Sequence, residues 1–242
     1  MRSSDRKNTD MRAIKITADI NKFAMGSALI ELGDTKVHCT ASVAFTVPRF
    51  LRHSNPAQGW LTAEYAMLPS ATPTRTKRER PQVGGRSQEI QRLIGRSLRG
   101  VIDLHKCPDL TITVDCDVIQ ADGGTRTAAI NGAYVALRMA TDKLYRSGRI
   151  DSDPIHHKVA AISVGIKDGE YLCDLDYEED SNIDLDMNVV MTDDGGILEV
   201  QGTAENRSFN KEQLAGIIDI AAASIRNIYQ CQEQALANLR ND

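Results

Sequence analysis

The order of the predicted strands and helices limits the possible folds of this chain more than any other feature. Residues 13–20, 27–32, 36–45, 60–68 and 110–119 are β-rich or alternate between apolar and polar side chains. Later strands are predicted at 159–166, 171–175, 187–191 and 197–201, and helices from Ser87 to about 101, at 127–145 and at about 211–239. This irregular order is typical of α+β proteins rather than of a repeated βαβ unit. With no internal repeat or clear linker, residues 1–242 are predicted to form a single domain.

The composition is that of an ordinary globular protein, with 41% hydrophobic and 26% charged residues. No apolar run approaches the roughly 20 residues that cross a bilayer. The N-terminal residues 1–12 are polar where a signal peptide would be apolar, so a cytoplasmic location is expected. The five cysteines are scattered without a C-x-x-C pair, and we expect them to be reduced, mostly buried and not catalytic.

A local concentration of basic residues is the only part of the sequence suited to contact nucleic acid. The formal net charge is −4, so the whole chain does not attract a polyanion. Residues 75–99 nevertheless contain eight basic and only two acidic side chains, beginning in a proline-containing loop and continuing along one face of the predicted helix. The candidate RNA-binding residues in this stretch are Arg75, Arg78, Arg80, Arg96 and Arg99.

Two glycine pairs precede predicted helices and suggest an anion site. In the segment 120–127, Gly123 and Gly124 allow backbone N–H groups to approach an anion, and Arg126 adds a cationic fork. The alternative is a tight turn without a ligand. Arg86 follows the second glycine pair, near Ser87 as the candidate N-cap, and its guanidinium suits a second edge of the same anion. A solvated arginine at a helix start is the alternative there.

Seven carboxylates fall within thirteen residues, from Asp174 to Asp186. Clustered carboxylates raise one another's proton affinity unless a cation or an arginine neutralises them. Oxygen ligands suit Mg²⁺, which is common where phosphate esters react. An acidic surface loop is an equal alternative, and spacing alone does not select ligands. No G-x-S-x-G pattern supports a covalent hydrolase.

Several segments together resemble the ribonuclease PH family over essentially the whole chain. They are residues 59–65 (GWLTAEY), 67–69 (MLP), 85–99, 115–127, 174–180, 186–192 and 199–205. The chain departs from the family pattern in three places. Residues 79–85 are shorter and lack a customary lysine, residues 51–60 are longer, and residues 4–6 lack a glycine.

The resemblance implies roles for particular residues. It places inorganic phosphate, as a co-substrate, on Arg86, Gly124, Thr125 and Arg126. It also implies that Asp180 and Asp186 hold Mg²⁺ or Mn²⁺ and that these two aspartates and Arg126 are catalytic.

The resemblance also implies an activity and an assembly. The expected fold has two mixed β-sheets built from βαβ units and packed with α-helices. The expected activity is phosphorolytic trimming of tRNA precursors from the 3′ end, reversible as nucleotide addition, by a homohexameric ring that is a trimer of dimers. Arginines of residues 75–80 are expected to guide the RNA. A catalytically silent RNA-binding subunit of an exosome-like ring is one alternative. A nucleoside phosphorylase is another, although the basic stretch would then contact no polymer.

Overall fold

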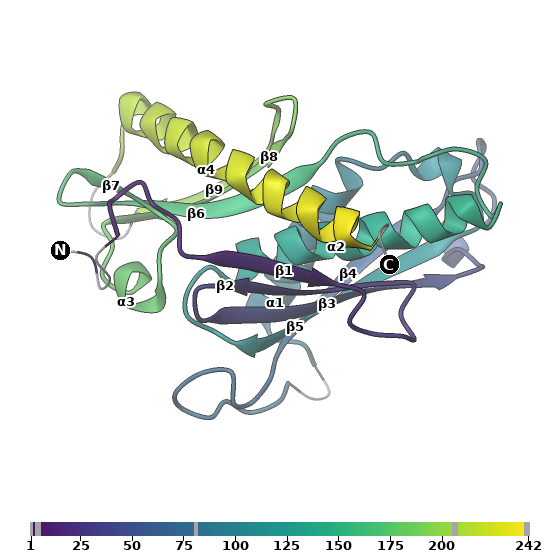
Figure 1. Cartoon of the computed structure of the whole chain (residues 1–242), viewed down its shortest axis with the longest axis horizontal. Coiled ribbons are helices and arrows are strands. Elements are labelled where there is room, and N and C mark those ends of the chain that lie inside the picture. The colour runs from purple at the N-terminus through teal and green to yellow at the C-terminus, as the bar shows by residue number, and fades with distance from the viewer. Residues whose placement is uncertain (1, 3–5, 80–81, 205–207, 240–242) are drawn as a thin grey trace.

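The computed structural model describes residues 2, 6–79, 82–204 and 208–239, which form two β-sheets packed with helices (Figure 1). The first sheet has the strand order β1-β2-β3-β5-β4. Its strands are β1 (Ile14–Ala18), β2 (Gly26–Leu32), β3 (Thr35–Ala44), β4 (Trp60–Met67) and β5 (Thr111–Gln120). Only β4 and β5 pair in parallel, because α1 (Gly85–Arg99) forms the crossover between them.

The second sheet has the strand order β7-β6-β8-β9. Its strands are β6 (Val159–Lys167), β7 (Glu170–Cys173), β8 (Leu185–Thr192) and β9 (Ile197–Ala204). The α+β class with two sheets is confirmed. The first sheet is mixed as expected, whereas every described pair in the second sheet is antiparallel, because short connections rather than crossover helices join these strands.

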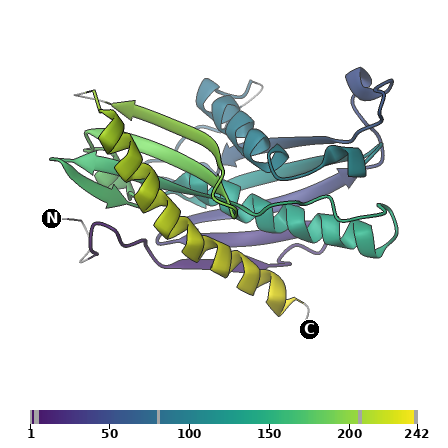
Figure 2. The ribbon, with the colours of Figure 1, turned by 90° about the horizontal axis from the view of Figure 1, so that it is seen from above.

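Helix α2 (Thr125–Arg146) lies between the two sheets and contacts β2, β3 and β6. Most of its residues are buried, including Ile130 and Leu137, as expected for a helix covered on several sides. Helix α4 (Lys211–Asn238) covers the other face of the second sheet and reaches β1 (Figure 2). The two sheets therefore share one central helix. The single-domain assignment stays a prediction.

The helix starts differ from those predicted. Helix α1 begins at Gly85 with Gly84 as N-cap, so the prediction of Ser87 as N-cap is wrong. Ser87 lies inside the first turn, where its hydroxyl donates a hydrogen bond to Glu79 (3.1 Å). Helix α2 begins at Thr125, two residues before the predicted start. The unpredicted elements are α3 (Tyr177–Asp180), η1 (Arg49–Leu51) and η2 (Leu104–Lys106), each too short to show a helical period.

The prediction of unpaired and mostly buried cysteines is confirmed, whereas their lack of a catalytic role stays a prediction. All five cysteines are free, and Cys39, Cys107, Cys116 and Cys173 are buried while Cys231 is partly exposed. In the described part of the chain, no helix is both long and apolar enough to span a membrane.

Candidate active site

A rigid glycine turn connects the end of β5 to the start of α2. Gly123 and Gly124 have positive φ angles of 70° and 63°, a conformation that favours glycine. A Cβ atom on Gly123 would lie 2.5 Å from the carbonyl oxygen of Leu175, so a side chain does not fit there. Thr35 fixes the turn, since its hydroxyl donates to the carbonyl of Gly123 (2.6 Å) and accepts from the N–H of Asp122 (2.9 Å). The turn presents the N-terminus of a 22-residue helix, which suits an anion.

Tyr65 of β4 supports the first residue of that helix. Its hydroxyl donates to Oγ1 of Thr125 at 2.9 Å, and its side chain is buried with the residue only 3% exposed. Burial raises the pKa of Tyr65, although its hydrogen bond to Thr125 and the charges of Arg86 and Arg126 act in the opposite direction. Tyr65 is therefore a neutral hydroxyl lying close to both arginines.

The two arginines predicted to bind phosphate lie at equivalent places in their helices. Arg86 is in the first turn of α1 and exposed, and Arg126 is in the first turn of α2. Each is the second residue after a glycine N-cap, so each belongs to a helix N-terminus. Together they offer two cationic forks and two helix starts, an arrangement suited to a multiply charged anion such as phosphate.

Asp180 completes this group from α3. Partial burial raises the pKa of Asp180, although it keeps contact with solvent, and the charges of Arg126 and Arg86 counteract this rise. The structure thus brings Arg86, Thr125, Arg126 and Asp180 together from three helices. These were four separate candidates in the sequence.

Asp186 lies on β8, opposite Thr203 of β9. Because alternate residues of a strand share a face, Asp186 lies on the same face as Asn188 and as Gln201, the residue opposite Asn188. Gln201 contacts Arg126, so this face of the second sheet is directed toward α2.

Arginines from the N-terminal segment neutralise much of the carboxylate-rich stretch. Arg12 donates to both oxygens of Asp174, and Arg2 pairs with Glu179 (2.7 Å). Arg6 lies 3.3 to 3.7 Å from carboxylate oxygens of Asp174, Asp176 and Glu179. At least three of the seven carboxylates, Asp174, Asp176 and Glu179, therefore have arginine counter-ions among the described residues, one of the two solutions expected from the sequence.

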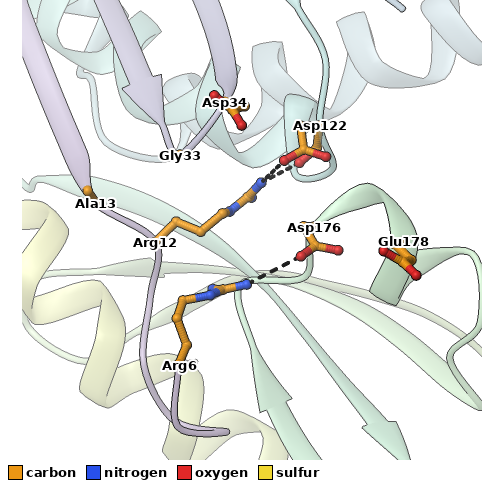
Figure 3. A pocket seen from close by; sticks show the side chains of 8 residues that line it. All are labelled: Arg6, Arg12, Ala13, Gly33, Asp34, Asp122, Asp176 and Glu178. Atoms are coloured by element: carbon orange, nitrogen blue, oxygen red, sulfur yellow. Dashed lines mark hydrogen bonds and ion pairs between the residues drawn. The ribbon is translucent and has the colours of Figure 1, made fainter. Parts of the chain in front are cut away.

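Arg6 and Arg12 line an open pocket beside the glycine turn, together with Asp34 and Glu178. Figure 3 shows Arg12 directed toward Asp122 and Arg6 directed toward Asp176. The N-terminal segment thus links the glycine turn to α3, the helix that carries Asp180. We did not predict this link from the sequence. The feature that could have indicated it is the acidic stretch, which needs cations nearby.

The chemistry of the site allows one mode of metal binding. Among the described residues, no group of three or more His, Cys, Asp or Glu side chains is placed to hold a metal ion. Mg²⁺ is commonly bound by one or two carboxylates together with waters and substrate phosphates. Asp180 and Asp186 fit that mode, in which the protein supplies only part of the coordination.

The predicted RNA-binding arginines differ in their surroundings. Arg75 and Arg78 are exposed on the loop before α1, which projects from the body of the protein (Figure 1). Arg96 pairs with Glu199 (3.0 Å). Arg99 donates to the carbonyl of Leu61 (2.9 Å) and lies 5.3 Å from the ring centre of Trp60, and burial lowers its pKa. Arg80 lies outside the described residues, as do Glu205 of the resembling segment 199–205 and Ser4 and Asp5 of the departing segment 4–6.

The fold is of the α+β class, with two sheets packed on a central helix and with two arginine-bearing helix starts near Asp180. Domain 1 of the 3′ exoribonuclease family matches residues 10–141, and domain 2 of that family matches residues 157–224. The chain therefore belongs to the 3′ exoribonuclease family, which includes ribonuclease PH. The first match covers the first sheet with α1 and most of α2, and the second covers the second sheet and the start of α4.

Three solved structures, two of them from exosomes, have the same fold. Rice (Oryza sativa) Rrp46 is 21% identical with a TM-score of 0.78, over 97% of this chain and 100% of that chain. A chain of the Archaeoglobus fulgidus exosome, with RNA bound to its active site, is 22% identical with a TM-score of 0.79, over 93% and 90% of the two chains. A chain of an archaeal exosome core is 20% identical with a TM-score of 0.76, over 94% and 89%. At these identities the likeness shows the fold.

Proposed function

We propose that this protein is a phosphorolytic 3′ to 5′ exoribonuclease that trims the 3′ ends of tRNA precursors with inorganic phosphate. The observation that carries the proposal is the convergence of Arg86, Arg126 and Asp180 beside the glycine turn. Two cationic forks and a carboxylate within one site suit a reaction between two phosphate groups. Membership of the 3′ exoribonuclease family supports RNA as the substrate.

Inorganic phosphate binds Arg86, Arg126, the hydroxyl of Thr125 and backbone N–H groups at Gly124 and Thr125. Phosphoryl transfer depends mainly on positioning and on neutralisation of charge, which these donors supply. One oxygen of the phosphate attacks the phosphorus of the last phosphodiester, and the bond from that phosphorus to the 3′ oxygen of the preceding nucleotide breaks. The products are a nucleoside diphosphate and an RNA one nucleotide shorter.

Asp180 assists protonation of the leaving 3′ oxygen. The nearness of Arg126 and Arg86, the proposed phosphate ligands, supports this role. Because the diphosphate product keeps a phosphoanhydride bond, the step is reversible, and excess diphosphate extends the RNA.

Asp180 and Asp186 would hold Mg²⁺ or Mn²⁺, which neutralises charge on the scissile phosphate when bound. Removal of the divalent ion with a chelator is expected to stop turnover and leave the fold intact, because Arg12 rather than the ion neutralises the buried carboxylate of Asp174. Circular dichroism before and after chelation checks the second point.

The RNA path and the assembly follow from the same proposal. The exposed residues Arg75 and Arg78, with Arg80, guide single-stranded 3′ ends, while Arg96 and Arg99 need to leave their present partners to do so. A cytoplasmic homohexameric ring, a trimer of dimers, is the proposed assembly. The similar exosome chains, one with RNA at its active site, support RNA binding and ring formation.

A catalytically silent ring subunit is the second candidate, because two of the similar solved structures are exosome chains. Incubating the protein with a 3′-extended tRNA, Mg²⁺ and inorganic phosphate separates the two candidates. Stepwise shortening supports the exoribonuclease, whereas RNA binding without shortening supports the silent subunit.

A further inference from the structure

Gln201 connects the second sheet to both helices that carry the arginines. It lies on β9, and its side chain leaves the sheet on the face directed toward α1 and α2. Its Oε1 accepts a hydrogen bond from Nη1 of Arg126 at 3.1 Å, and its Nε2 donates to Oε1 of Glu89 at 2.7 Å. One side-chain amide therefore joins the first turn of α2 to α1.

The chemistry of these contacts requires an amide. Arg126 can only donate and the carboxylate of Glu89 can only accept, so the residue between them needs one acceptor and one donor. Only one orientation of the Gln201 amide satisfies both partners. Glu89 also lies 3.8 Å from Nη1 of Arg126, which closes the group into a triangle.

The triangle holds one end of the Arg126 guanidinium. Both Gln201 and Glu89 approach Nη1, and the Arg126 side chain is only 17% exposed. Contacts at one nitrogen of a planar fork fix its direction, and the other nitrogens carry donors with the geometry that phosphate requires. Without these contacts the long side chain would need to be ordered when phosphate binds, which weakens binding.

We propose that Gln201 is a positioning residue that orients Arg126 for inorganic phosphate. The inference rests on the proposed phosphate site and adds a residue outside the anion-binding turn. Glu199 provides a matched control. It lies two residues earlier on the same face of β9 and also ties this strand to α1, but its partner is Arg96 rather than Arg126.

The test compares Gln201→Met, which keeps the side-chain length and removes both hydrogen bonds, with Glu199→Gln and the unchanged protein. KM for phosphate and kcat are measured at saturating RNA, and binding of inorganic phosphate alone is measured by calorimetry. For Gln201→Met we expect KM and the phosphate dissociation constant to rise about tenfold, as for loss of a hydrogen bond to a charged group, with kcat within about threefold. Glu199→Gln should change KM by less than about twofold, since its contact is exposed and away from Arg126.

A second variant, Gln201→Glu, covers the case in which Gln201→Met fails to fold. It keeps an acceptor for Arg126 but places a carboxylate against Glu89 and beside the bound anion, so KM for phosphate should again rise.

Unchanged phosphate binding in the folded Gln201 variants would overturn the inference while leaving the proposed function intact. An equal rise in Glu199→Gln would also overturn it, since general packing of β9 on α1 would then be the cause. If phosphate binding depends on Gln201 but the protein does not shorten RNA, the inference holds and the proposed activity is wrong. If the unchanged protein binds no phosphate, both are wrong.

Discussion

Arg12 donates three hydrogen bonds to the carboxylate of Asp174, from its backbone N–H (2.7 Å), Nε (2.9 Å) and Nη2 (2.7 Å). The Asp174 side chain is fully buried, and that of Arg12 is 8% exposed. Arg12 also donates to the carbonyl of Asp122. This one side chain therefore holds the glycine turn against the segment that leads to Asp180.

Replacing Arg12 with Met should destabilise the protein by about 3–5 kcal/mol, because the buried carboxylate of Asp174 then loses the arginine that donates three hydrogen bonds to it and keeps only Arg6 at 3.6 Å. Urea unfolding measures the change. Adding Asp174→Asn to the same protein should recover part of the loss, since no buried charge then remains at that place. A loss below about 1 kcal/mol, as for an exposed ion pair, would contradict a structural role for this contact.

Replacing Tyr65 with Phe should lower the affinity for phosphate. The variant removes the hydrogen bond that supports Thr125, and we expect stability to fall by about 1 kcal/mol and KM for phosphate to rise several-fold. Tyr229→Phe is the matched control, because Tyr229 is also buried and donates to the carbonyl of Met191 (2.7 Å) away from the arginines. Both variants should lose similar stability, and only Tyr65→Phe should change KM. An equal change in KM would show that stability, not the site, is responsible.

Replacing Arg126 with Ala should reduce kcat/KM for phosphorolysis by about 10²–10³ or more, because a preorganised cationic donor at the reacting phosphate is lost. Its circular dichroism spectrum should match that of the unchanged protein. Arg138→Ala is a suitable control, since Arg138 lies on the same helix but pairs with Asp153 (2.7 Å). Near-normal phosphorolysis in Arg126→Ala would remove the basis of the phosphate site.

The cysteines should differ sharply in reactivity. Burial raises the pKa of Cys107 and of Cys173 to about 11, so only about one in a thousand of these thiols would be ionised at pH 8. Cys231 is partly exposed and should react first with a thiol reagent. We expect one fast equivalent in the folded protein and five after unfolding. Rapid reaction of Cys107, located by peptide mapping, would contradict its burial.

The sequence predicted the long elements well because each has a strong local pattern. The strand at 111–120 and the helix that follows it depend on alternation and on an Ala-rich helical period, and both appear within a few residues of the predicted bounds. The start of α1 was misplaced because Gly84 occupies the N-cap position and leaves no side-chain signal. The four residues of α3 are too few to show a period.

The arrangement of the candidate site depended on contacts between distant parts of the chain. Arg86, Arg126 and Asp180 could be selected one by one from glycine pairs, carboxylates and a family resemblance. The pairing of Arg12 with Asp174 joins residues 162 positions apart, and that of Gln201 with Glu89 joins residues 112 apart. No local pattern encodes such pairs, because they follow from how the two sheets pack on α2. The prediction that residues 1–242 form a single domain stays a prediction, and the contacts of α2 with both sheets support it.

The most direct test of the central claim uses radiolabelled inorganic phosphate with an unlabelled 3′-extended tRNA and Mg²⁺. Phosphorolysis requires the added phosphate to become the terminal phosphate of the released nucleotide. We expect labelled nucleoside diphosphates that increase as the RNA shortens, and no release when phosphate is omitted. Release of unlabelled nucleoside monophosphates without added phosphate would contradict the account and identify a hydrolase.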